Sequence, residues 1–213
     1  MNLNKSSLLL YAVTDRAWLG EHTLTWQVEE SLKGGVTMVQ IREKHLDRTR
    51  FKAEALELKA LCRRYSVPFI VNDDVDLAME IGADGVHVGQ DDLEAGCVRG
   101  KLGPNKIIGV SAHTVEEAVR AQAAGADYLG AGAVFPTGTK GGVSPLTYQT
   151  LRAICAAVDI PVVAIGGIGP HNIMELAGSG ICGAAVVSSI YGQPDIQSAA
   201  RTLRAMCWKL VTP

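Results

Sequence analysis

The chain has 213 residues, of which 20 are Lys or Arg and 22 are Asp or Glu, so its formal net charge is −2. A chain of this length can bury its core as a single domain without disulfides or metals, and its 47% hydrophobic content is enough to build that core. No block of like charges is present, which argues against a nucleic-acid footprint or a polybasic membrane patch. Small molecules are therefore the expected partners.

The cysteines favour a cytoplasmic location. They are five in number, far apart and without a C-x-x-C pair, so neither a zinc site nor a disulfide framework is indicated. Near the N-terminus, the apolar run 8–10 is too short for a signal peptide or a membrane span. We therefore expect one soluble domain over residues 1–213, with no membrane partner.

Short β-rich runs alternate with segments of helical periodicity. Residues 49–65 place Phe51, Ala55, Leu58 and Cys62 on one helical face. Glycine recurs where helices are expected to end, at 33–36, 81–84, 124–127 and 179–182, and supplies the left-handed residue needed there. The expected strands are 8–14, 37–42, 69–72, 85–88, 107–111, 128–131, 162–165 and 184–187. Eight units of about 27 residues each predict a (β/α)8 TIM barrel, an α/β fold whose site lies at the C-terminal ends of the strands.

The second strand ends in a cationic segment. Period-two alternation puts Gln40 and Arg42 on one face and Val39 and Ile41 on the other. If the apolar face packs on the helices, Gln40 and Arg42 point into the barrel, with Lys44 just beyond, and the segment suits an anion. The alternative is a solvated, charged strand end.

Carboxylates gather after the third and fourth strands. Mg²⁺ is commonly held by one or two carboxylates plus substrate phosphates, and Asp73 with Asp92 would meet that need at the barrel mouth. The alternative is that Asp74 or Asp91 merely caps the following helix. In each pair, one Asp is expected to cap while the other binds metal.

Further polar groups follow the fifth strand. Ser111 offers a hydroxyl at the rim, and Thr114 with Glu117 forms a capping box. His87 and His113 could act as acid or base, although such histidines are more often structural.

The last three strands end in loops suited to phosphate. The segment 137–142 carries two hydroxyls, one cation and three glycines, although it could be a plain flexible loop. Gly166 and Gly167 follow the seventh strand, and Val187 and Ser188 follow the eighth, where many barrels bind phosphate. Together with the cationic and acidic segments, these loops predict two phosphorylated ligands and a metal.

These residues, in this order, resemble the thiamine phosphate synthase family over essentially the whole chain. The matching stretches are 11–15, 40–44, 72–73, 85–90, Ser111, 137–140, 166–168 and 187–188. The resemblance implies a transferase that joins 4-amino-5-hydroxymethyl-2-methylpyrimidine diphosphate to a thiazole phosphate, with dissociative departure of diphosphate.

The resemblance also implies roles for individual residues. Asp73 and Asp92 would bind Mg²⁺, and Arg42, Lys140 and Ser111 would act in catalysis. The pyrimidine diphosphate would be held by Gln40, Arg42, Glu43, Lys44, Asn72, Ser111 and Lys140. The thiazole phosphate would be held by Thr137, Gly138, Thr139, Gly167, Val187 and Ser188.

Two positions depart from the family pattern: Asp91-Asp92 replaces a common Glu-Asp, and Thr147 stands where Gly commonly follows Pro-Leu. The second departure puts the local helix entry in doubt. A homodimer stays open, because Trp208 could pack inward or against another subunit. The rival functions are a thiazole tautomerase, a sugar-phosphate isomerase or epimerase using His87 with Asp73, and a catalytically silent protein that binds thiazole phosphate or thiamine phosphate.

Overall fold

The computed structural model describes residues 3–89, 95–138 and 145–212, and its strands close into one parallel barrel in chain order, from β1 to β8. The strands are β1 (Leu10–Val13), β2 (Met38–Ile41), β3 (Phe69–Asn72), β4 (Gly85–Val88), β5 (Ile107–Ala112), β6 (Tyr128–Gly132), β7 (Val162–Ile165) and β8 (Ala184–Val186). β8 returns to pair with β1. The predicted (β/α)8 barrel is confirmed.

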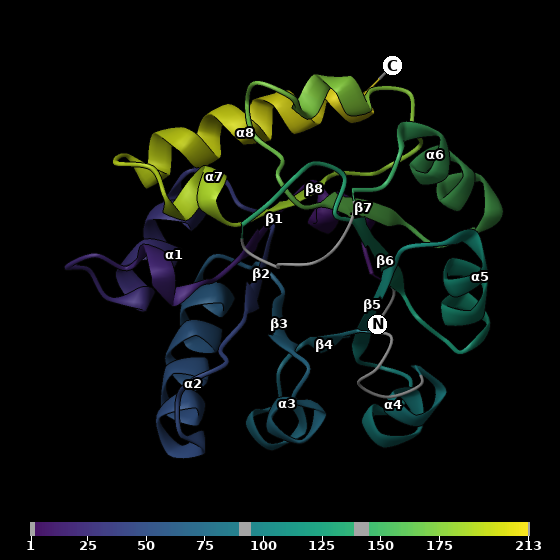
Figure 1. Ribbon diagram of the computed structural model, residues 1–213. Helices are drawn as coiled ribbons and strands as arrows, with labels where there is room; N and C mark the ends of the chain where they lie inside the picture. Colours follow the sequence, from purple (N-terminus) through teal and green to yellow (C-terminus); the bar gives the residue numbers. More distant parts are fainter. Residues whose placement is uncertain (1–2, 90–94, 139–144, 213) are drawn as a thin grey trace.

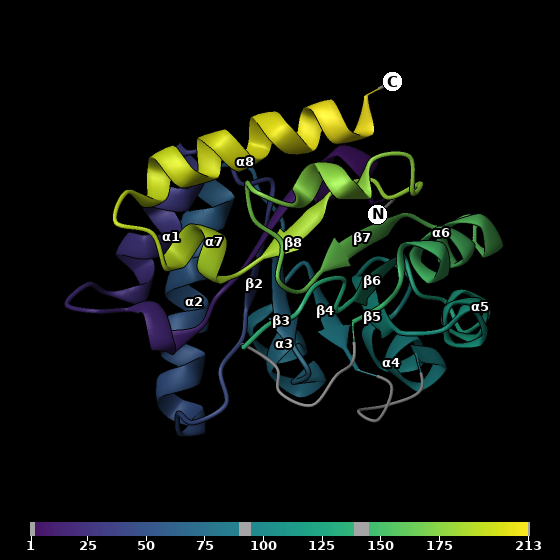
Figure 2. The same ribbon diagram turned by 45° about the horizontal axis from the view of Figure 1, so that its top comes forward.

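Helices surround the strands, and α8 lies across β8 and β1 (Figures 1 and 2). The α-helices are α1 (Leu24–Lys33), α2 (Arg48–Arg64), α3 (Val75–Ile81), α4 (Ala95–Leu102), α5 (Val115–Ala123), α6 (Tyr148–Ala157), α7 (Ser188–Tyr191) and α8 (Ile196–Val211). The 3-10 helices are η1 (Lys5–Leu8), η2 (Arg16–Trp18) and η3 (Ile173–Leu176). Between β7 and β8 the chain thus forms η3, a single short turn, in the place of the long helix of the other units.

Two apolar layers follow from the period-two alternation of the strands. Val39 and Ile41 belong to the layer between the barrel and the helices, together with Leu58 of α2. Met38 and Ile70 belong to the separate cluster that fills the barrel interior. The predicted facing of β2 is therefore confirmed, and its polar inward side chains belong to the interior.

Gly82 ends α3 in the left-handed conformation, with a φ of 66°, as expected for the joint at 81–84. No helix ends at the joint expected at 179–182: Gly180 is left-handed, with a φ of 97°, but η3 has already ended at Leu176. Thr147, which departs from the family pattern, caps α6 by accepting a hydrogen bond from the backbone N–H of Thr150 at 3.1 Å. The N-terminus of α6 is thus properly capped, because threonine is a good N-cap residue.

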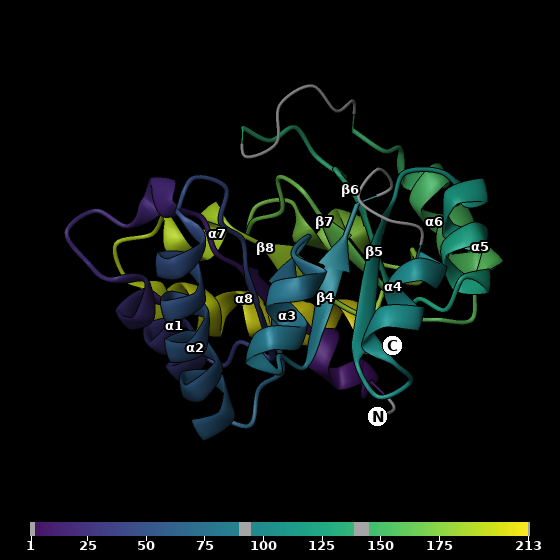
Figure 3. The ribbon, with the colours of Figure 1, turned by 90° about the horizontal axis from the view of Figure 1, so that it is seen from below.

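The strand bounds differ from the predicted ones at the first strand. The predicted strand 8–14 begins at Leu10, because residues 5–8 form η1. Asn4 caps that turn by accepting from the backbone N–H of Ser6 at 3.0 Å. All strands run toward one face, at the top of Figure 3, and the N terminus lies at the opposite face. This common face carries the loops that build the site.

Candidate active site

The C-terminal ends of the strands enclose a cavity of about 390 Å³. It gathers most of the predicted site residues from strands that are far apart in sequence. Those lining it are Gln40, Arg42, Lys44, Asn72, Asp73, Ser111, Thr137, Gly167, Val187 and Ser188. Most lie at alternate positions along their strands, as expected for side chains that point into a barrel.

Two other predicted residues are described but do not line the cavity. Glu43 pairs with Arg16 instead, and Gly138 is also absent from the lining. Thr139, Lys140 and Asp92 lie outside the described residues, as does Asp91. The cationic loop after β6 and the second predicted metal ligand therefore stay predictions.

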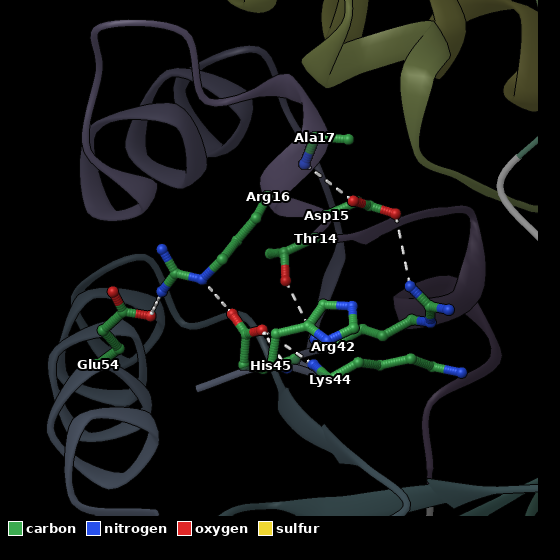
Figure 4. Close-up of polar contacts among 9 residues, drawn as sticks. Thr14, Asp15, Arg16, Ala17, Arg42, Lys44, His45 and Glu54 are labelled. Atoms are coloured by element: carbon green, nitrogen blue, oxygen red, sulfur yellow. Dashed lines mark hydrogen bonds and ion pairs between the residues drawn. The ribbon is translucent and has the colours of Figure 1, made fainter. Parts of the chain in front are cut away.

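Arg42 and Lys44 form the cationic side of the cavity. Their side chains extend to the same side after β2 (Figure 4). The Arg42 guanidinium lies 3.4 Å from a carboxylate oxygen of Asp15, and the Arg42 backbone N–H donates to Thr14 Oγ1 at 3.0 Å. Asp15 is itself fixed, since it accepts from the backbone N–H of Ala17 at 3.0 Å. The loop after β1 thus orients an arginine toward the cavity.

Glu43 holds this loop instead of contacting the cavity. It pairs with Arg16. Arg16 also pairs with Glu54 of α2 (Figure 4). Burial opposes ionisation of Glu43, but hydrogen bonds from the backbone N–H of His45, from Arg16 and from the backbone N–H of Lys44 together lower its pKa. Glu43 is therefore ionised, and its ion pair with Arg16 links the loop after β1 to the loop after β2. The expectation that it touches the pyrimidine substrate is not supported by this placement.

The two aspartates after β3 have separate roles. Asp74 caps α3, accepting from the backbone N–H of Leu77 at 2.8 Å, and pairs with Arg48 on the outside of the barrel at 3.0 Å. Asp73 instead lines the cavity and accepts a hydrogen bond from Asn72 Nδ2 at 2.5 Å. Its backbone is left-handed, with a φ of 61°, an unusual conformation that aspartate tolerates. The predicted division between capping and cavity carboxylates is seen here.

The chemistry of the cavity fits Mg²⁺ with a phosphorylated substrate. Asp73 offers one hard oxygen ligand beside Arg42 and Lys44, and Mg²⁺ is commonly held by few carboxylates plus phosphate oxygens. Within the described ranges, no three or more His, Cys, Asp or Glu side chains are grouped so that they could hold a metal ion.

The glycines after β7 line the cavity and allow the neighbouring backbone to pass close to them. A side chain at Gly167 would lie 2.5 Å from the carbonyl oxygen of Pro136, and its φ is 66°. Asn172 fixes this loop, donating to the Gly167 carbonyl at 2.9 Å and accepting from the Gly169 N–H at 2.8 Å. The Ser189 hydroxyl donates to the Ile168 carbonyl and ties the β8 loop to it. Hydrogen bonds thus connect the two loops beside Val187 and Ser188.

The histidines have structural partners. The His113 backbone N–H donates to Glu117 Oε2 at 2.6 Å, and His113 Nδ1 lies 3.2 Å from the same oxygen. Glu117 therefore bonds His113, whereas Thr114 still caps α5 by accepting from the Glu117 N–H at 3.2 Å. His87 is buried and lies 3.1 Å from Ser111 Oγ through its Nε2.

Sequence reasoning missed the polar floor of the cavity. Tyr11 and Tyr128 are fully buried inside the barrel, and their hydroxyl oxygens lie 2.8 Å apart. Alternation shows which side chains share a strand face, but it does not show which side chains meet across the barrel. A tyrosine at an inward position of an apolar strand was the one available signal.

A (β/α)8 barrel with cations on one side of its mouth and glycine-lined loops on the other defines an enzyme that acts on phosphorylated small molecules. The family model "Thiamine monophosphate synthase" matches residues 10–190. The chain therefore belongs to the thiamine monophosphate synthase family and is a transferase of thiamine biosynthesis.

Individual relatives agree. A thiamine-phosphate synthase of Alkaliphilus oremlandii is 50% identical over 196 residues, covering 92% of this chain and 94% of that protein. A second, from Ruminiclostridium cellulolyticum, is 47% identical over 200 residues, covering 94% and 95%. The structure of thiamine phosphate pyrophosphorylase from Pyrococcus furiosus superposes with a TM-score of 0.89 at 38% identity, covering 98% of this chain and 99% of the other. Within the described ranges, no helix has the length and apolar character needed to span a bilayer.

Proposed function

We propose that the cavity joins 4-amino-5-hydroxymethyl-2-methylpyrimidine diphosphate to a thiazole phosphate, giving thiamine phosphate and diphosphate. The observation that carries this assignment is the single cavity lined by both Arg42 and Lys44 on one side and Gly167 and Ser188 on the other. The two groups of residues would each bind one of the two anionic substrates. The membership of the chain in its family supplies the identity of the two substrates.

The cationic side is assigned to the diphosphate. Arg42 and Lys44 would bind its oxygens, with Lys140 joining them as the matching family residue, and Gln40, Asn72 and Ser111 would complete the pyrimidine subsite. Asp73 would hold Mg²⁺ with Asp92. Mg²⁺ bound there would neutralise charge that develops on the departing diphosphate.

The opposite side is assigned to the thiazole phosphate. Thr137, Gly167, Val187 and Ser188 line this part of the cavity, and the family motif adds Gly138 and Thr139. The C–O bond of the pyrimidine methylene breaks with its electron pair going to diphosphate, and the lone pair of the thiazole nitrogen forms the new C–N bond on the opposite side. Cavity side chains then contribute positioning and charge stabilisation, and no protein nucleophile is needed.

The experiment incubates purified protein with both substrates, with and without Mg²⁺, and measures thiamine phosphate and diphosphate. Equal, Mg²⁺-dependent amounts of the two products are expected. Conversion of thiazole phosphate alone without Mg²⁺ would favour a tautomerase, and binding without turnover would favour a silent binding protein. Two observations weigh against a sugar-phosphate isomerase. The relatives are named as thiamine-phosphate synthases, and isomerisation would give no role to Arg42 and Lys44 in the cavity.

Cytoplasmic location and homodimer formation belong to the same proposal. All five cysteines are free thiols, which suits a reducing compartment. Trp208 of α8 is 60% exposed, so it does not pack inward, and a second copy would bury it. Sedimentation velocity of the protein and of Trp208→Ser tests the dimer: a monomeric unmodified protein would contradict it. Cell fractionation tests the location.

A further inference from the structure

Side chains hold the backbone of the loop that brings Lys44 to the cavity. β2 ends just before Arg42, so the backbone N–H groups of this loop need acceptors other than the sheet. The Arg42 N–H donates to Thr14 Oγ1 at 3.0 Å. The N–H groups of Lys44 and His45 both donate to Glu43 Oε1, at 2.9 and 3.1 Å. One carboxylate oxygen therefore fixes the backbone from which the Lys44 side chain extends.

The other oxygen of this carboxylate holds a cation. Glu43 Oε2 pairs with the guanidinium of Arg16. The same guanidinium pairs with Glu54 of α2 (Figure 4). The side chain of Glu43 is only 5% exposed, whereas those of Arg16 and Glu54 are 32% and 30% exposed. Arg16 thus connects a nearly buried carboxylate to an outer helix, although Arg16 is not one of the residues that line the cavity.

A buried carboxylate depends on its countercharge. Removing one partner of a buried ion pair is strongly destabilising, because the other charge is left uncompensated away from water. Without Arg16, the Glu43 carboxylate would keep two backbone donors but lose the guanidinium that is bonded to it. Rotation toward water, or toward the ammonium group of Lys44, would relieve this cost. Either rotation would release the N–H groups of Lys44 and His45.

We propose that Arg16 and Glu43 are positioning residues that hold the Lys44 ammonium group in place for the diphosphate. Arg16 keeps the carboxylate in place, the carboxylate keeps the loop backbone in place, and the backbone directs Lys44 into the cavity. Arg42 has its own contacts with the loop after β1, so Arg16 should act through Lys44 and not through Arg42. The inference rests on the proposed function in assigning Lys44 to the diphosphate.

The first measurement is the Kd of inorganic diphosphate, by isothermal titration calorimetry at one fixed Mg²⁺ concentration, which requires no turnover. Arg16→Met leaves the carboxylate without its cation, and the Kd should rise roughly tenfold, which corresponds to about 1.4 kcal/mol. Glu43→Met removes the acceptor of the two N–H groups and should raise the Kd by a similar factor. Glu43→Gln keeps a carbonyl oxygen for them, so its Kd should stay within about threefold of the unmodified value.

The second measurement is rescue by removal of the buried charge. In the double variant Arg16→Met/Glu43→Gln, no buried charge is left unpaired, and the amide oxygen still accepts from the loop N–H groups. The double variant should therefore bind diphosphate more tightly than Arg16→Met does. If Arg16 only braced α2 through Glu54, a change at Glu43 would rescue nothing.

A double-mutant cycle tests whether Arg16 acts through Lys44. Lys44→Ala should weaken diphosphate binding by itself. Adding Arg16→Met to Lys44→Ala should change the Kd by less than about twofold, because the side chain that Arg16 positions is already gone. In steady-state kinetics, Arg16→Met should raise the KM for the pyrimidine diphosphate and leave the KM for the thiazole phosphate within about twofold, since the loops after β7 and β8 keep their own hydrogen bonds.

Arg99→Met is the matched control. Arg99 of α4 is 23% exposed and pairs with Asp127 at 2.6 Å, and it does not line the cavity. Its loss removes a partly buried ion pair of the same kind. Arg99→Met should therefore lower the unfolding free energy, measured in urea, without changing the Kd of diphosphate.

Three results would each overturn the proposal: an unchanged Kd in folded Arg16→Met, no rescue by Glu43→Gln, or effects of Arg16→Met and Lys44→Ala that multiply fully. If Arg16→Met does not fold, Glu43→Met and Glu43→Gln decide, and equal Kd values for these two variants would overturn the proposal. Diphosphate that does not bind the unmodified protein would overturn the proposed function, and this inference with it.

Discussion

Arg42 shows how one side chain can serve the cavity without holding the fold. It lines the cavity, and Asp15 contacts its guanidinium at 3.4 Å on the rim, where both side chains are partly exposed. Ion pairs of this exposure contribute little to folding stability, about 1 kcal/mol or less. Losing Arg42 should therefore lower the activity much more than the folding stability.

Arg42→Ala should lower kcat by roughly 10²-fold, the range found when a charge-stabilising donor is removed from an active site. Thermal unfolding should change little. Diphosphate release and calorimetry measure the two effects. Arg50→Ala is the control, since Arg50 also pairs with a carboxylate, Asp47 at 3.5 Å, but is exposed on α2. Parallel loss of folded protein and activity in Arg42→Ala would contradict the assignment.

Glu43, unlike Arg42, stabilises the fold, and its contribution to the free energy of unfolding should depend on pH. Its pKa is lowered in the folded protein from an ordinary value of 4.5, so the ionised carboxylate stabilises the fold above that value. The contribution is lost as the pH falls through the lowered pKa. Glu43→Gln should reduce the free energy of unfolding at neutral pH by roughly 1–3 kcal/mol, because Arg16 loses a buried partner.

Urea titrations of Glu43→Gln and the unmodified protein, at neutral pH and at successively lower pH, test this dependence. The difference between the two should shrink once the pH drops below the ordinary value. Glu80→Gln, which removes an ion pair to Lys52 at 2.6 Å on the exposed face, should give a smaller difference at neutral pH. A difference for Glu43→Gln that grows on acidification would show that the carboxylate is not held ionised.

At the scale of elements, the alternation along each strand decides what the barrel contains. The expected strands 69–72, 85–88 and 162–165 match the observed ones, because apolar runs there end sharply at polar residues or glycine. Alternation also correctly separated Gln40 from Ile41. It could not orient Glu43, which lies beyond the end of β2, where the pleat no longer fixes side-chain direction. Nor could it find the Tyr11–Tyr128 contact, which joins β1 and β6, two strands that are not neighbours in the closed barrel.

Gly109 of β5 tests whether neighbouring strands need a residue without a side chain at this position. Gly109→Ala should destabilise the protein by about 1–3 kcal/mol, since the added methyl would overlap His87 and Tyr128. Gly100→Ala in α4 is the control, because nothing lies within 4 Å of an added methyl there. It should be neutral or stabilise by up to about 1 kcal/mol. Equal unfolding free energies for the two variants, measured in urea, would mean that β5 shifts to accept the methyl group.

At the scale of the whole molecule, the mouth of the barrel collects residues from all eight strands, so a ligand there couples distant parts of the chain. Gln40 and Ser188 line one cavity although β2 and β8 are separated by most of the sequence. Any ligand that binds only this folded arrangement must stabilise the whole barrel. This coupling offers a test of the metal that does not depend on turnover.

Diphosphate with Mg²⁺ at one hundred times its Kd should stabilise the protein by about 2.7 kcal/mol. For a chain of this size that corresponds to a rise in Tm of roughly 5–10 °C. Diphosphate without Mg²⁺ should give a smaller rise, and Asp73→Asn should remove most of the difference between the two conditions. Asparagine suits this substitution because it tolerates the left-handed backbone at residue 73.

Asp76→Asn is the control for this titration, since Asp76 is exposed on α3 and pairs with Lys101 at 3.4 Å. It should keep the full Mg²⁺-dependent rise in Tm. If Asp73→Asn also keeps the full rise, Asp73 does not ligate the metal, and the Mg²⁺ that diphosphate carries must be held by other residues of the chain. If instead Mg²⁺ adds nothing to the unmodified protein, diphosphate binds through the side chains of the cationic subsite without the metal, and the metal proposal fails while that subsite stands.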